Sequence, residues 1–200
     1  MQKELINQAL ALFDTPEKWN AFVEIANQKD NMRDHWLQKA KQPLLEYFMA
    51  KPTDGWVCEP WGDNKYDLRW YLAAFGRDSL ALATGWRFQF TLHVKDLAAY
   101  DEKVINNLLR TTHSPLLAAF GRVDQQFETE KKATENRNYY FGSPYDSNFG
   151  DSNLDKLAWF VGNRTEEFAR QIIAKVEAFT TNPELTRMLY EVNEKSRKVR

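Results

Sequence analysis

Cysteine and long apolar runs are what this 200-residue sequence lacks most clearly. Its one cysteine, Cys58, has no partner within the chain, which excludes an intramolecular disulfide. No apolar run approaches the ~20 residues that a membrane-spanning helix needs, and the polar residues throughout MQKELINQALALFD exclude a charged-then-apolar leader at this end. These absences predict a cytoplasmic protein with no membrane partner.

An excess of charge of one sign is also missing. The chain carries 27 Lys and Arg against 28 Asp and Glu, so no global field gathers nucleic acid, and binding to nucleic acid would need a local basic patch. The histidines, His35, His93 and His113, are too isolated to place two ligands on one metal. The stretch DSNFGDSN begins like a calcium loop, but Leu157 stands where a bidentate glutamate is required. The sequence therefore predicts neither a metal site nor a cofactor.

What the sequence does contain is a helical pattern, then a strand pattern, then a helical pattern again. Apolar residues recur at helical spacing through residues 1–51 and through 151–200, where Gly162 interrupts the pattern. Residues 52–150 show turn residues and β-type alternation, with one or two helices among them. This order predicts an α+β fold of N-terminal helices, a central antiparallel sheet and C-terminal helices in a single domain of residues 1–200. The first apolar stripes comprise Leu5, Ala9, Leu12 and Phe13, then Trp19, Phe22, Val23 and Ala26.

The clearest alternation lies between residues 80 and 94. It predicts one long strand, Leu80 to Val94, that pairs with Tyr66 to Ala74 and points Trp86, Phe88 and Phe90 into the core. The residues between these apolar positions are polar, so we expect the other face of the sheet to be wet. Arg69 and Arg87 would then lie on a solvent-exposed face that can contact a partner.

The hexapeptide LAAFGR occurs twice, at residues 72–77 and 117–122. In the first copy, Gly76 is expected to supply a positive φ in a hairpin turn. The second copy follows Ser114 and Pro115, which favour a helix start, although a strand over residues 114–122 is nearly as compatible with the pattern. Neither copy has the glycines and following helix of a phosphate loop, so the repeat is interpreted as chance.

The stretch YYFGSPYDSNFGDSN, residues 139–153, combines aromatic residues with Gly, Ser, Asn and Asp and contains no Lys or Arg. Rigid aromatic area among small polar groups is typical of binding loops, although the same rings could equally pack into the core. We therefore predict a non-enzymatic protein-interaction module that binds another protein through this loop and the polar sheet face. The predicted contact residues are Tyr139, Tyr140, Tyr145, Phe149, Arg69 and Arg87.

A metal-dependent nuclease, or a nuclease-related nucleic-acid-binding domain, is the alternative hypothesis. Glu130 and Lys132 have the Glu-x-Lys spacing, and Asp67 on an earlier strand could supply the second carboxylate for a divalent cation. The hypothesis requires these three residues to converge, whereas ETEKKATENR also has the composition of a solvated turn. Nucleophile motifs are absent, because no serine stands in a Gly-x-Ser-x-Gly setting and Glu59 beside Cys58 would raise the pKa of the thiol.

Overall fold

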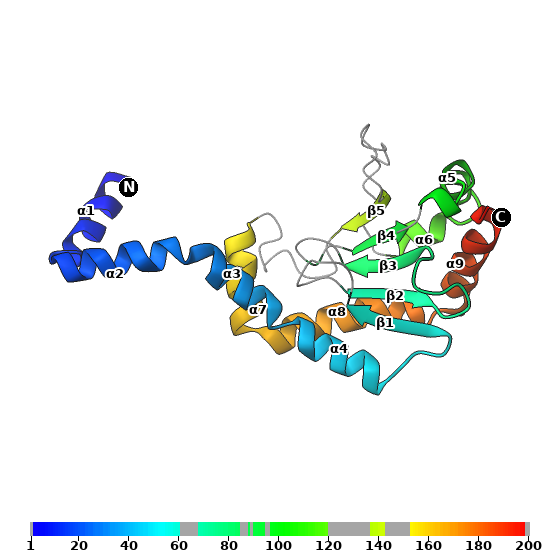
Figure 1. Ribbon diagram of the computed structural model, residues 1–200, viewed down its shortest axis with the longest axis horizontal. Helices are drawn as coiled ribbons and strands as arrows, with labels where there is room; N and C mark the ends of the chain where they lie inside the picture. The colour runs from blue at the N-terminus through cyan, green and yellow to red at the C-terminus, as the bar shows by residue number, and fades with distance from the viewer. Residues whose placement is uncertain are drawn as a thin grey trace.

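The computed structural model describes residues 2–60, 68–84, 88, 90–94, 97–119, 137–142 and 153–198. Over these ranges it confirms the α+β prediction, with helices at both ends of the chain and an antiparallel sheet between them (Figure 1). No helix in these ranges has the length and apolar character needed to cross a membrane.

Four helices open the chain: α1 (Gln2–Leu12), α2 (Pro16–Asn27), α3 (Lys29–Gln38) and α4 (Lys41–Ala50). Helix α2 begins where Thr15 accepts a hydrogen bond from the Lys18 amide, and Pro16 follows in the first turn, where a missing N–H leaves no bond unmade. Helices α1 and α2 extend away from the rest of the molecule, whereas α4 lies against the sheet (Figure 1). We call α1 and α2, residues 2–27, the arm.

The sheet runs in chain order through β1 (Trp56–Pro60), β2 (Leu68–Leu72), β3 (Ala81–Thr84), β4 (Phe90–Val94) and β5 (Arg137–Gly142). Each strand is antiparallel to the next. Trp70 of β2 stands opposite Cys58 of β1 and Leu82 of β3, and Leu82 stands opposite Leu92 of β4. The pairing of β2 with β3 confirms the predicted contact between these two stretches of chain.

The prediction of one strand from Leu80 to Val94 is wrong. The stretch forms two short strands, Ala81–Thr84 and Phe90–Val94, that pair with each other. A single strand of that length would extend roughly 50 Å, well beyond the ~17–20 Å typical of strands in globular proteins. Phe88, between the two strands, has a φ of 56°, a left-handed conformation that interrupts extended chain. Phe88 and Phe90 are nevertheless both buried, as predicted.

The two copies of LAAFGR differ over the residues that the structure describes, which in the second copy are residues 117–119. Gly76 has a φ of 75° in the connection from β2 to β3, which confirms its predicted turn role. The second copy enters helix α6 (Ser114–Ala118), so the helical alternative holds for the described part of that segment. Residues 73–75 of the first copy form a turn, whereas residues 117–118 of the second copy are helical, so the described parts of the two copies do not share a structure.

The C-terminal half of the core comes from α7 (Leu154–Asn163), α8 (Thr165–Thr180) and α9 (Pro183–Ser196), and α5 (Glu102–Arg110) packs beside α9. Aromatic pairs join these helices and α4 to the sheet region. Phe48 of α4 contacts Trp70 with ring centroids 5.3 Å apart, and Phe179 of α8 contacts Trp56 at 5.9 Å. Trp56 and Trp70 lie on the same sheet face, which is therefore the face that α4 and α8 cover.

Candidate protein-interaction surface

Several of the predicted site residues lie outside the described ranges: Asp67, Arg87, Glu130, Lys132, Tyr145 and Phe149. Tyr139 and Tyr140 lie on β5, where they stand opposite Leu92 and Thr91 of β4. The first part of the predicted aromatic loop is thus a paired strand. Its role as a binding element stays a prediction.

The prediction that Arg69 lies on a solvent-exposed face of the sheet is wrong. Its side chain is buried, and its guanidinium donates hydrogen bonds to the backbone oxygens of Arg77 and Ser79. Ala83 and His93, on the same sheet face, are buried as well. Alternation cannot separate a solvated polar residue from one whose hydrogen bonds are satisfied inside the protein. An enclosed Arg69 offers no surface to a partner, so we remove it from the candidate contacts.

The surroundings of Arg69 indicate a structural role. Burial lowers the pKa of its guanidinium, and the negative charges of Asp78 and Glu59 partly oppose that shift. Glu59 also contacts Arg77, with Oε1 and Nε 3.4 Å apart. Burial, followed by the charge of Glu59, raises the pKa of the Cys58 thiol to about 12, which bears out the predicted effect of Glu59 and leaves the thiol a poor nucleophile.

A second polar cluster links Thr112, His113 and Glu191. The Thr112 hydroxyl lies 2.7 Å from Nδ1 of His113, and Nε2 of His113 lies 3.1 Å from Oε2 of Glu191. A hydroxyl, an imidazole and a carboxylate in sequence have the composition of a nucleophile triad. Glu191 also forms ion pairs with Lys195, at 2.9 Å, and with Arg187, so its carboxylate contacts two cations besides His113. Because His113 is buried and connects the turn after α5 to α9, we interpret the cluster as a structural contact that holds these two segments together.

The largest unexplained feature of the described structure is the arm. No side chain described before Leu37 is buried, and α2 contributes nothing to the core. Helices α1 and α2 nevertheless carry matching apolar stripes at positions i, i+3, i+4, i+6 and i+7. The stripes are Ile6, Ala9, Leu10, Leu12 and Phe13 in and just after α1, and Trp19, Phe22, Val23, Ile25 and Ala26 in α2.

Most of these large apolar side chains are about half exposed. Trp19 is 47% exposed and Ile25 59%. We define the arm face as the exposed large apolar side chains of α1 and α2: Ile6, Leu10, Leu12, Trp19, Phe22, Val23 and Ile25. Exposed large apolar side chains on helices that bury none of their described residues make the arm face a candidate interaction surface.

Three rings join the two stripes where α1 meets α2. Phe13 lies 4.5 Å from Phe22 and 6.1 Å from Trp19 between ring centroids, and Trp19 lies 5.7 Å from Phe22. This aromatic cluster sets the corner between the helices while Trp19 and Phe22 stay partly exposed. Large aromatic side chains of this kind are the anchors of many protein interfaces.

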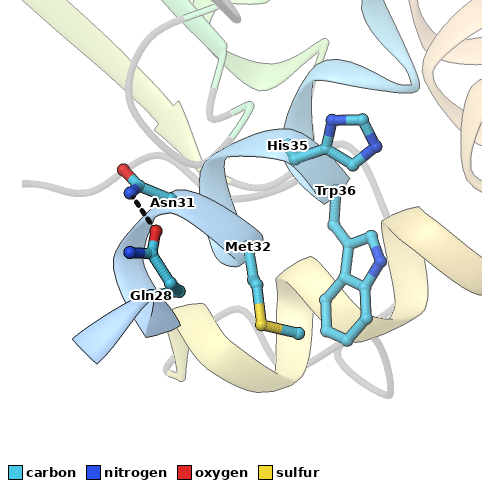
Figure 2. Close-up of a pocket in the computed structure, with 5 residues that line it drawn as sticks. All are labelled: Gln28, Asn31, Met32, His35 and Trp36. Atoms are coloured by element: carbon cyan, nitrogen blue, oxygen red, sulfur yellow. Dashed lines mark hydrogen bonds between the residues drawn. The ribbon is translucent and has the colours of Figure 1, made fainter. Parts of the chain in front are cut away.

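The arm is fixed to the body through α3. Asp155 of α7 binds Lys29 Nζ at 2.5 Å and Arg33 Nη1 at 3.4 Å, and these two cations, Lys29 first, lower the pKa of the carboxyl. Gln28, Asn31, Met32, His35 and Trp36 border a hollow of about 280 Å³ on this helix, with Met32 and Trp36 side by side (Figure 2). The arm therefore projects from an anchored base.

Sequence reasoning identified an apolar stripe in each of α1 and α2, with Leu5 in place of Ile6 and Leu10 in the first and without Ile25 in the second, and gave the stripes no role. The sequence does carry a signal for the arm, because two amphipathic helices come before the first segment whose apolar residues enter the core. A stripe has the same spacing whether its own chain or another molecule covers it. Only the position of the arm outside the body separates the two cases (Figure 1).

Searches of protein-family models, curated proteins and solved structures find no match for this chain.

Proposed function

We propose that this protein is a non-enzymatic interaction module that binds another protein through the arm face. The observation that carries the proposal is that Trp19, Phe22 and their apolar neighbours lie on helices that contribute no buried side chain to the described core. Exposed apolar surface on this scale is unfavourable in water unless a partner covers it.

The size of the arm face fits a protein interface. If the seven arm-face residues are given the roughly 150–250 Å² of an aromatic side chain as an upper scale, about half exposure gives an exposed area of at most on the order of 700 Å². A standard protein interface covers about 800 Å² on each partner. The arm face alone therefore approaches the area of a specific interface.

The chemistry of the surface favours a protein partner over nucleic acid. Helices α1 and α2 place Lys3 and Lys18 among the acidic residues Glu4, Glu17 and Glu24. Lys18 is also paired with Asp14, Nζ to Oδ1 at 2.5 Å. Nucleic acid binding draws its affinity from several unpaired cations facing phosphates, which this surface does not supply. An apolar helix or groove in another protein matches it better.

Site-specific photocrosslinking of the full chain tests the proposal. A benzophenone amino acid replaces Phe22 in the arm, and in a second variant it replaces Trp159, an aromatic residue of α7 in the body that is slightly more exposed than Phe22. After irradiation in cells that express the protein, we expect a protein adduct from position 22 and none from position 159. Adding Trp19→Lys should remove the adduct. Equal adduct formation at the two positions, or none at position 22, would contradict the proposal.

The nuclease hypothesis is the second candidate, and it rests on Asp67, Glu130 and Lys132, all outside the described ranges. Among the residues that the structure does describe, no three His, Cys, Asp or Glu side chains gather in a way that could hold a metal ion. Titration with Mg²⁺ and Mn²⁺ and a DNA cleavage assay address it directly. Metal-dependent cleavage that is lost in both Asp67→Ala and Glu130→Ala would favour the nuclease over the interaction module.

A further inference from the structure

The apolar stripe of α2 continues the side of α3 that packs against α7. We infer that the partner of the arm covers this stripe with an amphipathic α-helix, which packs on α2 at the helix positions that α7 contacts on α3. This inference rests on the proposed function and names the kind of structure that the partner presents.

The packing of α3 against α7 shows how this side of the helix is covered within the chain. Lys29 and Arg33 of α3 contact Asp155 in the first turn of α7, and Trp36 contacts Gly162 near the other end of α7. The contacting positions 29, 33 and 36 are four and three residues apart, as expected for one side of a helix. Helix α7 therefore covers a single side of α3.

The same side carries the stripe of α2. Two turns of a helix take close to seven residues, so positions that differ by seven lie on the same side. The residues seven before Lys29 and Arg33 are Phe22 and Ala26, and Trp19 comes seven before Ala26. Three residues of the stripe thus repeat the positions at which α3 meets α7.

Gln28, the one residue between α2 and α3, keeps the two helices in this relation. Its ψ of 2° departs from helical geometry, yet helical hydrogen bonds continue across it. Its amide donates to the Glu24 oxygen at 3.2 Å, and its own oxygen accepts from the Met32 amide at 2.9 Å. Both bonds join residues four apart, which is the spacing of an α-helix.

Helix α7 does not reach the stripe of α2. It begins at Leu154, after Asn153 with φ −131° and ψ 107°, which is extended backbone. Helix α2 buries none of its side chains, and Trp19, Phe22 and Val23 are 37–47% exposed. The side that a helix covers on α3 is therefore left exposed on α2.

A helix fits this stripe better than an extended strand does. A strand binds by pairing its backbone with an open sheet edge, whereas the backbone groups of α2 bond within the helix. The other side of α2 is polar and carries Glu17, Glu24 and Gln28. A single row of apolar side chains on a helix packs into the grooves of a second helix, as α3 and α7 do.

The sizes of the side chains describe the partner helix further. On α3, the Trp36 ring lies against Gly162 and leaves no space for a side chain there. The stripe of α2 is large at Trp19 and Phe22 and small at Ala26. Close packing then requires a small residue level with Trp19 and a large apolar residue level with Ala26, about seven positions apart in the partner helix.

Photocrosslinking at three positions of the full chain tests the inference. The benzophenone amino acid replaces Trp19, Phe22 or Ala26 in turn, and mass spectrometry of the adducts from cells that express the protein identifies the attached residues. We expect all three to attach to one segment of one other protein, at residues three, four or seven apart. Sites two apart or in separate segments would overturn the inference, as would attachment to this chain itself or to a second copy.

Two alanine variants test close packing on the stripe. Ala26→Trp fills the space that a large residue of the partner helix would enter, so it should lower the adduct yield at residue 22 about fivefold or more. Ala21→Trp adds the same ring on the polar side of α2 and should leave that yield unchanged. Equal yields from the two variants would contradict a helix packed on the stripe. Far-ultraviolet circular dichroism confirms that each variant keeps its helices.

The two proposals fail in different ways. An adduct at residue 22 that joins a strand or a scattered surface of a different protein removes the helix and leaves the interaction module intact. The absence of any adduct at residue 22 removes both proposals.

Discussion

Trp36 of α3 packs directly against Gly162 of α7. A Cβ atom at position 162 would lie 2.5 Å from Cγ of Trp36, closer than any real contact permits. Glycine inside a helix normally destabilises it by about 1 kcal/mol relative to alanine. At this position, glycine lets α3 approach α7 closely enough to anchor the base of the arm.

Gly162→Ala is therefore expected to lower the free energy of unfolding, although alanine is the better helix former. The clash involves the root of the Trp36 side chain, which cannot swing away as the tip of a flexible side chain can. Overpacking of this kind costs about 1–3 kcal/mol, which exceeds the gain in helix propensity. Urea unfolding measures the difference. An increase of about 1 kcal/mol in the variant would mean that Trp36 repacks without cost.

Asn193 is expected to be the most sensitive polar residue of the core. It is fully buried on α9, where its Oδ1 accepts from the Leu80 amide at 2.9 Å and from the Tyr100 hydroxyl at 3.0 Å. Its Nδ2 donates to the backbone oxygens of Leu80 and Leu189. Asn193→Ala leaves several buried groups unpaired, each at about 1–3 kcal/mol, so we expect a loss of at least about 3 kcal/mol in urea unfolding.

The matched comparison for that variant is Tyr100→Phe, which removes only one of the four hydrogen bonds of Asn193. It should cost about 1 kcal/mol. Equal effects of the two variants would show that Asn193 contributes little beyond its contact with Tyr100.

Glu191 makes the stability of the fold depend on pH in the acid range. Hydrogen bonds from Lys195, then from His113, lower the pKa of its carboxyl from 4.5 to about 2. Because the folded-state pKa is the lower one, this stabilisation is present above the unfolded-state pKa and is lost as the pH falls from about 4.5 toward 2. The midpoint of urea unfolding should therefore fall more steeply over this range in the wild type than in Glu191→Gln.

Glu194→Gln, an exposed change on the same helix, controls for the general loss of acidic charge. It should follow the wild type across the acid range. Parallel curves for the wild type and Glu191→Gln would show that the contacts of Glu191 with His113 and Lys195 add nothing to stability.

The sequence predicted the fold class and some local conformations because these depend on nearby residues. Helical and strand patterns gave the α+β order, and Gly76 was identified as a positive-φ turn residue. The burial of Phe88 and Phe90 followed from alternation. Alternation did not reveal the chain reversal between Thr84 and Phe90, because two short strands and one long strand can share the same pattern.

The sequence patterns could not predict interactions between distant parts of the chain. Arg69 appeared to be a surface residue because its hydrogen-bond acceptors, the backbone oxygens of Arg77 and Ser79, carry no sequence signature. Gly162 was identified as an interruption, and α7 does end one residue later, at Asn163, before α8 begins at Thr165. Its contact with Trp36 of α3 had no sequence signal. The arm face is a third case. Apolar stripes in α1 and α2 could be seen in the sequence, but the sequence did not show that no described segment of the chain covers them.

The mass of the native complex formed by the full chain in extracts of cells that express it tests the arm most directly. The wild type, Trp19→Lys and Trp159→Lys are compared at equal expression, because the two tryptophans are equally exposed and lie on the arm and on the body respectively. The account predicts that the wild type and Trp159→Lys migrate well above the 23.5 kDa of one chain, whereas Trp19→Lys migrates as a single chain. Identical masses for all three proteins would contradict the claim that the arm face binds a partner.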